Sequence, residues 1–211
     1  MTKKSKQPSR PTGSVLAGGA VLKKLADFFF EVGTLRKLAR SHRQTLLTDD
    51  LSDNIASHSY RGVMIGWFLA NLEKTDPYKV VTMCLFHDTG EARSGDQNWV
   101  HKKFVKIFED EIHDGQLKNL PFNDELSSVS LEYQERKSKA ALIAKDADLL
   151  DQILLLKEYS WVGNKEAAMW LKSKSGHYSL LKTKNARQIA EKILSSNPSD
   201  WWNDLWTPHR R

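Results

Sequence analysis

The sequence predicts an all-α protein that folds as a single helical bundle. Apolar residues recur every three or four positions through most of the chain, which is helical spacing, and patterns typical of strands are nearly absent. The 211 residues suffice for one domain that buries its own core. With 40% hydrophobic and 27% charged residues, the composition is that of a globular protein. We therefore expect one domain over residues 15–211.

Residues 1–14 (MTKKSKQPSRPTGS) contain no apolar period and are predicted to form a disordered basic tail. The formal net charge of the chain is +6, and four of these charges belong to Lys3, Lys4, Lys6 and Arg10, which leaves +2 for the rest. The basic character is therefore mostly a property of the tail. Four cations neutralise few phosphates, so a nucleic-acid partner is not expected.

The expected cellular location is based on the cysteine content and on the apolar segments of the sequence. Its single cysteine, Cys84, excludes an intrachain disulfide and a thiolate zinc cage, which suits a reducing compartment. No apolar segment of a secretory signal precedes Val15. The longest nearly uncharged apolar stretch, residues 63–72, is far shorter than the roughly 20 residues of a membrane span. We expect a cytoplasmic protein that does not enter a membrane.

The first helices are predicted from apolar spacing and capping residues. Apolar positions from residue 15 onward predict a first helix that ends at about Ala39. After a polar turn, Ser52 or Asp53 is expected to cap a second helix over residues 55–72. Asp76 followed by Pro77 is a typical helix start, and the buried helix that follows runs to Phe86.

The remaining elements are predicted in the same way. Residues 89–99 are polar and contain glycine, so we expect a loop there, followed by a helix over 100–113 that Gly115 ends. The longest helix is expected over residues 131–161, and another over 186–194. After Pro198 an aromatic turn is predicted to pack the C-terminus onto the bundle through Trp201, Trp202 and Trp206.

The most apolar of these helices ends in the pair His87-Asp88 (VVTMCLFHD). A buried run should not end in two ionisable groups unless something compensates for their desolvation, and a metal ion would do so. A second pair, His113-Asp114, lies in a charged stretch and is expected at a solvated helix end. In a helical bundle further ligands come from facing helices. Candidates for these further ligands are His58, in the helix predicted over residues 55–72, and Asp148, in the helix predicted over 131–161.

The order His58, His87-Asp88, Asp148 resembles the H…HD…D signature of the HD-domain metal-dependent phosphohydrolase superfamily. HDTGEARSGD resembles the HDxxExxxGD segment of its small single-domain branch related to the bacterial 5′-deoxynucleotidases. LRKLARS, SDNIASHSYR and IAKDADLLDQILLLKEY are also similar to this branch. The resemblance covers roughly residues 20–206 and implies an HD domain. One departure is Ser57, which stands where the branch usually has an acidic residue.

A mixed set of imidazole and carboxylate ligands suits one divalent ion, namely Mn²⁺, Co²⁺, Fe²⁺ or Ni²⁺, while Mg²⁺ and Zn²⁺ stay open. Four protein ligands on an octahedral ion leave two positions, one for water and one for a phosphoryl oxygen. The resemblance implies general acid/base chemistry or positioning of water for Glu91. Asp96 is expected to orient the water or to protonate the leaving alkoxide, or alternatively to cap the next helix.

The substrate contacts are predicted less directly. The resemblance nominates Arg40 for the phosphate, since arginine binds a phosphate dianion in a fork. Glu132, in LEYQER, is expected to contact a sugar hydroxyl. Trp67 and Trp99 are either base-stacking or core residues, and the core is the expectation for a tryptophan in an apolar helix. The other cations open to a phosphate role are Arg43, Arg61, Arg93 and Lys145.

The resemblance implies a phosphomonoesterase that acts on nucleoside 5′-monophosphates, with deoxynucleotides as the preferred substrates. Within enzymes, the alternative is an HD hydrolase of a deoxynucleoside triphosphate or of a cyclic or alarmone nucleotide. From another class, the alternative is a non-catalytic scaffold that binds nucleic acid through the basic tail. A homodimer is a further expectation, because small HD proteins are often dimers.

Overall fold

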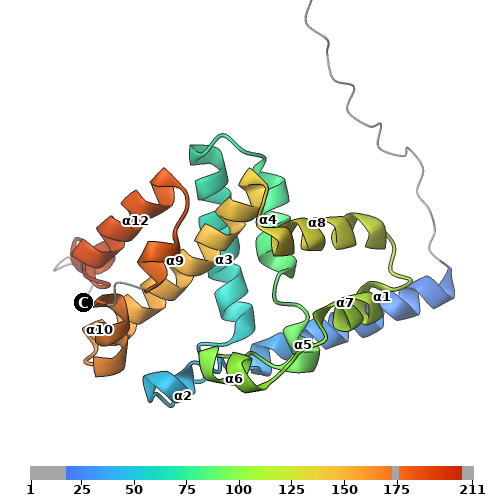
Figure 1. The fold of residues 1–211 in the computed structure, drawn as a ribbon, viewed down its shortest axis with the longest axis horizontal. Helices are drawn as coiled ribbons and strands as arrows, with labels where there is room; N and C mark the ends of the chain where they lie inside the picture. The colour runs from blue at the N-terminus through green and yellow to red at the C-terminus, as the bar shows by residue number, and fades with distance from the viewer. Residues whose placement is uncertain (1–17, 173–175, 206–211) are drawn as a thin grey trace, which may run out of the picture.

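The structure is a computed structural model that describes residues 18–172 and 176–205 (Figure 1). Within these ranges no strand forms, and the one bridge of β type joins Ala39 to Asn54. The all-α prediction is therefore confirmed. The helices are α1 (Gly19–Val32), the 3-10 helix η1 (Gly33–Lys37), α2 (Arg43–Leu46), α3 (Ile55–Leu72), α4 (Pro77–Phe86), α5 (Glu91–Ser94), α6 (Trp99–Phe104), α7 (Glu109–Leu117), α8 (Asn123–Glu135), α9 (Lys139–Trp161), α10 (Lys165–Lys172), α11 (His177–Leu180), α12 (Lys184–Ser195) and α13 (Asp200–Asn203).

The core lies where α9 crosses α3 and α4 (Figure 1). Helix α9 is central because small and branched apolar side chains line it on almost every side. Helices α3 and α4 approach closely at Gly66, where an added Cβ atom would lie 2.8 Å from the Sγ atom of Cys84. The largest fully buried apolar side chains of this core are Leu69, Val80, Met83, Ile143, Leu150, Ile153 and Leu181.

The N-terminal helix differs from its prediction. The α-helical part ends at Val32, and η1 replaces it from Gly33. Leu38 is extended, and the backbone N–H of Arg40 donates to the carbonyl of Asp53. A continuous helix to Ala39 was therefore a wrong prediction, because this segment leaves the helix to pair with the start of α3. The pairing places Arg40 beside that helix.

Helix α3 spans the predicted range, but its N-cap is Asn54 rather than Ser52 or Asp53. The Asn54 side chain accepts from the backbone N–H of Ser57, and the Ser57 hydroxyl accepts from the backbone N–H of Asn54. This is a capping box, with serine in the position that glutamate usually takes. The departure at Ser57 therefore has a structural role at the start of the helix.

The middle of the chain follows the prediction in part. Helix α4 begins at Pro77, and Asp76 caps it by accepting from two backbone N–H groups. The expected loop over residues 89–99 contains the short helix α5. The single helix over 100–113 was wrong, since α6 ends in the extended residue Val105 and α7 begins again at Glu109 with three acidic residues in its first turn. Gly115 lies inside α7 instead of ending it.

The predicted long helix over 131–161 is two helices, α8 and α9. Arg136 adopts a left-handed conformation between them, with φ 55° and ψ 27°. Ser138 then caps α9 by accepting from the backbone N–H of Ala141. Periodicity continued through this corner, but the capping serine was the signal for a new helix. Helices α2, α10 and α11 were also missed, being eight residues or shorter.

The C-terminal part confirms the helix over 186–194, which lies within α12. The predicted packing of the aromatic turn is wrong for Trp201, which is 74% exposed and contacts Trp202. Trp206 and the predicted basic tail, residues 1–14, lie outside the described residues. Among the helices of the described ranges, none combines the length and the apolar character that a bilayer crossing needs.

A buried carboxylate fixes the segment before α12 onto α9, and this predicts a large effect on stability. Asp146 is fully buried and accepts from the backbone N–H groups of Lys182 (2.8 Å) and Thr183 (2.7 Å). We expect Asp146→Ala to lower the free energy of unfolding by roughly 2–4 kcal/mol, because both donors lose their partner. Urea denaturation measures this. The control, Asp76→Ala, removes an exposed cap and should cost only about 1 kcal/mol, so an equal loss in both variants would contradict the prediction.

Candidate active site

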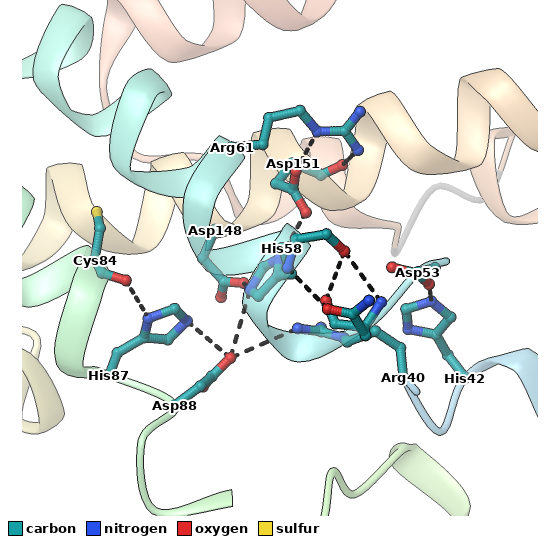
Figure 2. A network of polar contacts seen from close by, with 12 residues as sticks. Arg40, His42, Asp53, His58, Arg61, Cys84, His87, Asp88, Asp148 and Asp151 are labelled. Carbon is teal, nitrogen blue, oxygen red and sulfur yellow. Dashed lines mark hydrogen bonds and ion pairs between the residues drawn. The ribbon is translucent and has the colours of Figure 1, made fainter. Parts of the chain in front are cut away.

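Three helices bring the four predicted ligand residues together (Figure 2). His58 comes from α3, His87 and Asp88 from the end of α4, and Asp148 from α9. The His87 Nε2 atom lies 3.0 Å from Asp88 Oδ2. The His58 Nε2 atom lies 3.5 Å from the same oxygen and 3.2 Å from Asp148 Oδ1. Both imidazole side chains are almost completely buried.

The arrangement fits a metal ion. One ligand atom each from His58, His87 and Asp88 lies within 4.8 Å of the others. The Nε2 atoms of both histidines are buried and make no hydrogen bond to any residue that the structure describes. Two buried imidazole nitrogens beside a carboxylate are a set of ligand atoms that a divalent cation satisfies. Asp148 lies outside this group of three but beside His58, and Lys145 holds its second oxygen.

The other ring nitrogen of each histidine fixes its orientation. His87 Nδ1 lies 2.9 Å from the carbonyl oxygen of Cys84, and His58 Nδ1 contacts the carboxylate of Asp151. Because a carbonyl only accepts, His87 carries its proton on Nδ1 and keeps Nε2 free as a donor to metal. For His58, the Asp151 carboxylate likewise accepts the Nδ1 proton, and Nε2 points toward Asp88 and Asp148.

Asp151 is a site residue that the sequence reasoning missed. It is buried, and Arg61 donates to it from the outer side (Figure 2). The available signal was its position three residues after Asp148 in an otherwise apolar helix, which places both carboxylates on one face. A carboxylate behind a metal-binding histidine raises the basicity of the ring.

We expect Asp151→Asn to weaken divalent-metal affinity by roughly 10- to 100-fold, because the orienting negative charge behind His58 is lost. Titration of the metal-stripped protein with Mn²⁺, followed by calorimetry, measures this. Glu158→Gln is the matched control, since Glu158 accepts from the same Arg61 without contacting His58. Equal metal affinity in the Asp151 variant and the wild type would rule out the orienting role.

The charges of the site lower the pKa values of Asp88 and Asp148 and raise the pKa of His58. Burial raises the pKa of Asp88, but His87 and His58 hold it well below its ordinary value. For Asp148, Lys145 and His58 likewise overcome burial and lower the pKa. Burial lowers the pKa of His58, and the carboxylates of Asp148, Asp151 and Asp88 reverse this and raise it well above its usual range. Two ionised carboxylates therefore face the histidines.

Glu91 behaves differently from these carboxylates. Burial, Asp88 and Asp96 raise its pKa to about 9, against the lowering by Arg40 and His58. Its Oε2 atom is buried and has no hydrogen-bond partner. Glu91, at the start of α5, lines the same cavity as His87, Asp88 and Asp148, and His58 contacts Asp148 behind this wall. A carboxyl with this pKa can hold a proton at neutral pH and exchange it with a reacting group.

Arg40 lies beside the histidines with donors to spare. Its Nη1 atom is 3.5 Å from Asp88 Oδ2, and its Nε atom is 3.7 Å from Asp96 Oδ2. Both nitrogen atoms are buried and make no hydrogen bond. Asp96 accepts from the backbone N–H and the hydroxyl of Ser41, and so fixes the segment that carries Arg40. The alternative role of Asp96 as the cap of the next helix is wrong, because Asn98 caps α6.

These groups open into a cavity of about 970 Å³. Its walls include Arg40, Asp88, Glu91, Asp96, Lys145 and Asp148. Among the other cations considered for phosphate, only Lys145 lines this cavity. Arg61 pairs with Asp151 and Glu158, Arg93 with Glu31, and Arg43 lies 3.9 Å from Asp49. Tertiary structure therefore selects Arg40 and Lys145 from five candidates.

Other predicted contacts are placed elsewhere. Glu132 pairs with Lys79 and does not line the cavity, whereas its neighbour Tyr133 does. Trp67 is 43% exposed on α3, so the expectation of a core residue was wrong, and it does not reach the cavity. Trp99 does line the cavity. His113, expected at a solvated helix end, lies within α7 and also lines the cavity.

Several cavity residues carried no signal that the sequence reasoning used. His42 lines the wall and pairs with Asp53 at 2.6 Å. The Tyr133 ring packs against the ring of His87, with centroids 5.3 Å apart, and the Arg136 guanidinium stacks on Tyr133. Gln152, Met169, Trp170, His177 and Leu180 complete this part of the wall.

Comparison with known proteins agrees with this geometry. Residues 34–202 match the HD domain family. The chain is similar to 5′-deoxynucleotidase HDDC2 of Dictyostelium discoideum, with 27% identity over 146 residues, 63% of this chain and 76% of that protein. Among solved structures, a protein from Pyrococcus horikoshii OT3 is 26% identical with a TM-score of 0.65, covering 81% of this chain and 96% of that one. A predicted metal-dependent phosphohydrolase from Magnetospirillum magnetotacticum MS-1 shares the fold, with a TM-score of 0.63, 21% identity, and coverage of 83% and 91%.

Proposed function

The chain belongs to the HD-domain family, and from this premise we propose that it is a divalent-metal-dependent phosphohydrolase that removes phosphate from (deoxy)nucleoside 5′-monophosphates. The observation that carries the proposal is one site in which two buried imidazole Nε2 atoms and Asp88 face an arginine whose Nε and Nη1 atoms make no hydrogen bond within the described residues. The similarity to a 5′-deoxynucleotidase supports a nucleotide as the substrate.

His58, His87 and Asp88 would hold the ion, with Asp148 as the fourth ligand. When bound, a divalent cation supplies Lewis-acid polarisation of the phosphoryl group and lowers the pKa of water. The mixed imidazole and carboxylate donors favour Mn²⁺, Co²⁺ or another transition metal, and Mg²⁺ is also compatible. The second oxygen of Asp148 stays with Lys145, which keeps that carboxylate ionised beside the cavity.

The side chains of the cavity then divide the work. Arg40 binds non-bridging phosphate oxygens through its guanidinium, whose Nε and Nη1 atoms face Asp96 and Asp88 without a hydrogen bond to any described residue. Lys145 adds a second positive charge to the cavity wall. It binds the Oδ2 atom of Asp148, whereas His58 faces the Oδ1 atom. Hydrolysis breaks the bond between phosphorus and O5′, so the leaving oxygen needs a proton. Glu91 exchanges a proton at Oε2, either with the attacking water or with this oxygen.

Asp96 keeps Arg40 in place through Ser41 and orients water or the leaving group as a second carboxylate. Glu132 was expected to contact the sugar, and its position beside Lys79 makes Tyr133 or Gln134, which line the cavity, better placed for that contact. The single free cysteine, Cys84, is compatible with the proposed cytoplasmic location.

A panel of nucleoside mono-, di- and triphosphates tests the function after the protein is stripped with a chelator and supplied with Mn²⁺, Co²⁺ or Mg²⁺. We expect inorganic phosphate as the sole phosphorus product from dAMP and no turnover in the stripped protein. Release of tripolyphosphate or pyrophosphate from a triphosphate would instead favour the triphosphohydrolase alternative. Absence of hydrolysis for every phosphate ester would favour the non-catalytic scaffold.

We also propose that the chain forms a homodimer through the outer face of α3. Tyr60, Met64, Trp67, Phe68 and Leu72 are all large and exposed. They recur at helical spacing on the side opposite the buried positions of α3. A helix that is apolar on both sides is normally buried on both sides.

A second copy fits this face better than a charged partner. Arg61, the one Lys or Arg of α3, is bound to Asp151 and Glu158, and α3 contains no Asp or Glu. Three of the five exposed residues are aromatic and a fourth is methionine, the apolar residue types that are enriched at protein interfaces. Antiparallel contact about a twofold axis would bring Met64 of one copy close to Trp67 of the second.

Sedimentation of the wild type and of Trp67→Glu tests the dimer. We expect a dimer for the wild type and a monomer for the variant, because a buried glutamate without a partner opposes association. Phe30→Glu is the matched control, since Phe30 is also exposed but lies on α1. A monomeric wild type, or a dimer that survives Trp67→Glu and dissociates with Phe30→Glu, would contradict this interface.

A further inference from the structure

The cavity is larger than its phosphate-binding groups require. A volume of about 970 Å³ lies at the upper end of what small-molecule sites span. Arg40, Glu91, Asp88 and Asp148 account for one part of its wall. A second part comes from α10, which packs against α9 (Figure 1), and from the short helix α11, which also packs against α9.

The α10–α11 wall has a different chemical character from the phosphate end. It consists of Met169, Trp170, His177 and Leu180, which all line the cavity. The rings of Trp170 and His177 are stacked, with centroids 6.4 Å apart and planes 20° from parallel. Parallel aromatic faces flanked by apolar side chains suit a planar ring, and stacking on such faces accepts any base.

His177 adds a polar group to this wall. Its Nδ1 atom is buried and has no hydrogen-bond partner among residues 18–172 and 176–205. Burial lowers the pKa of His177, Asp148 raises it, and Lys145 and Arg40 lower it, so the ring is neutral at pH 7 and lies within electrostatic reach of the phosphate-binding groups. A neutral imidazole offers one donor and one acceptor, as the edge of a nucleobase does.

We propose that the α10–α11 wall is the subsite for the nucleobase, with the Trp170–His177 pair as its stacking surface and His177 as the hydrogen-bonding group. The inference rests on the proposed nucleotidase function and names which part of the cavity recognises the base. Trp99, the other tryptophan of the cavity, is 66% exposed. Lys102, one turn later on α6, also lines the cavity, so this end is more polar than the α10–α11 wall, where Trp170 is half-buried.

The test compares a substrate that has a base with one that lacks it. The wild type, His177→Ala and Trp170→Leu are assayed with dAMP and with 2-deoxyribose 5-phosphate under the same metal. We expect each variant to lose about tenfold or more in kcat/KM for dAMP, through KM. The kcat/KM for 2-deoxyribose 5-phosphate should stay unchanged, because this substrate leaves the subsite empty.

The outcomes separate the subsite from the function itself. Hydrolysis of neither substrate by the wild type would refute the proposed function. If the wild type hydrolyses both substrates and each variant loses kcat/KM equally for dAMP and for 2-deoxyribose 5-phosphate, only the subsite is refuted. The same holds if Trp99→Leu, and not the two α10–α11 variants, loses kcat/KM for dAMP alone. Because Trp170 also packs against the cluster around Leu46 and Leu156, His177→Asn serves as a second variant that leaves that packing intact. It should retain part of the preference for dAMP.

Discussion

Replacing Asp88 with alanine is expected to abolish metal binding and to lower turnover by roughly 10³-fold or more. Asp88 is the one carboxylate in the group of three with His58 and His87, and its Oδ2 atom faces both Nε2 atoms. Without it, the two imidazoles and the more distant Asp148 remain, and the buried Arg40 loses its nearest counter-charge. Metal content by mass spectrometry and hydrolysis of dAMP measure the two effects.

Asp114→Ala is the matched control for Asp88→Ala. Asp114 also follows a histidine, but it lies on α7 and does not line the cavity. Asp114→Ala should therefore retain both metal and activity. Asp88→Asn, which keeps the shape of the side chain, should lose metal as the alanine variant does. Full metal content in either Asp88 variant, or activity of the chelator-stripped wild type, would refute the metal-centred mechanism.

The second large effect is expected at Glu91. Glu91→Gln should lower kcat for dAMP by about 10²- to 10⁴-fold while the protein keeps its metal, because the amide preserves the shape but cannot exchange a proton. The elevated pKa of Glu91, about 9, marks the group as one that can carry this proton. Steady-state kinetics and metal content are measured on the same preparation.

Glu109→Gln is the matched substitution for Glu91, since Glu109 lines the same cavity but is not a member of the group formed by His58, His87 and Asp88. It should leave kcat unchanged. If Glu91→Gln loses its metal together with its activity, Glu91 belongs to the ligand set rather than to the proton transfer. An unchanged kcat would remove it from the chemistry altogether.

The local rules of the sequence were sufficient for some parts of the fold. Helix α3 and the start of α4 follow from apolar spacing and from Asp76-Pro77, which act within a few residues. The same local rules failed at corners, where the spacing of apolar residues continues although the helix does not. Arg136 turns the chain in a left-handed conformation between α8 and α9, and η1 replaces the helix after Val32. At these two corners, contacts with other segments determine the backbone conformation.

The residue types of the candidate site were also visible in the sequence, because buried ionisable groups at the end of VVTMCLFHD need compensation wherever they lie. Their surroundings were not visible. The contact between His58 and Asp151 joins residues 93 positions apart, and it depends on how α3 and α9 pack. Contacts between helices also decided the other roles: Arg61 pairs with Asp151 on α9, Arg93 with Glu31 on α1, and Glu132 with Lys79 on α4, which leaves Arg40 at the cavity.

The sequence by itself determined that the chain is helical, where its strongest helices begin, and which four side chains are candidates to bind a metal ion. Only the tertiary structure decided which cations reach the cavity, which carboxylate orients His58, and which face of α3 remains exposed. The physical reason is range: spacing, capping and desolvation act over one or two helical turns, whereas the site is assembled from helices that are distant in the chain.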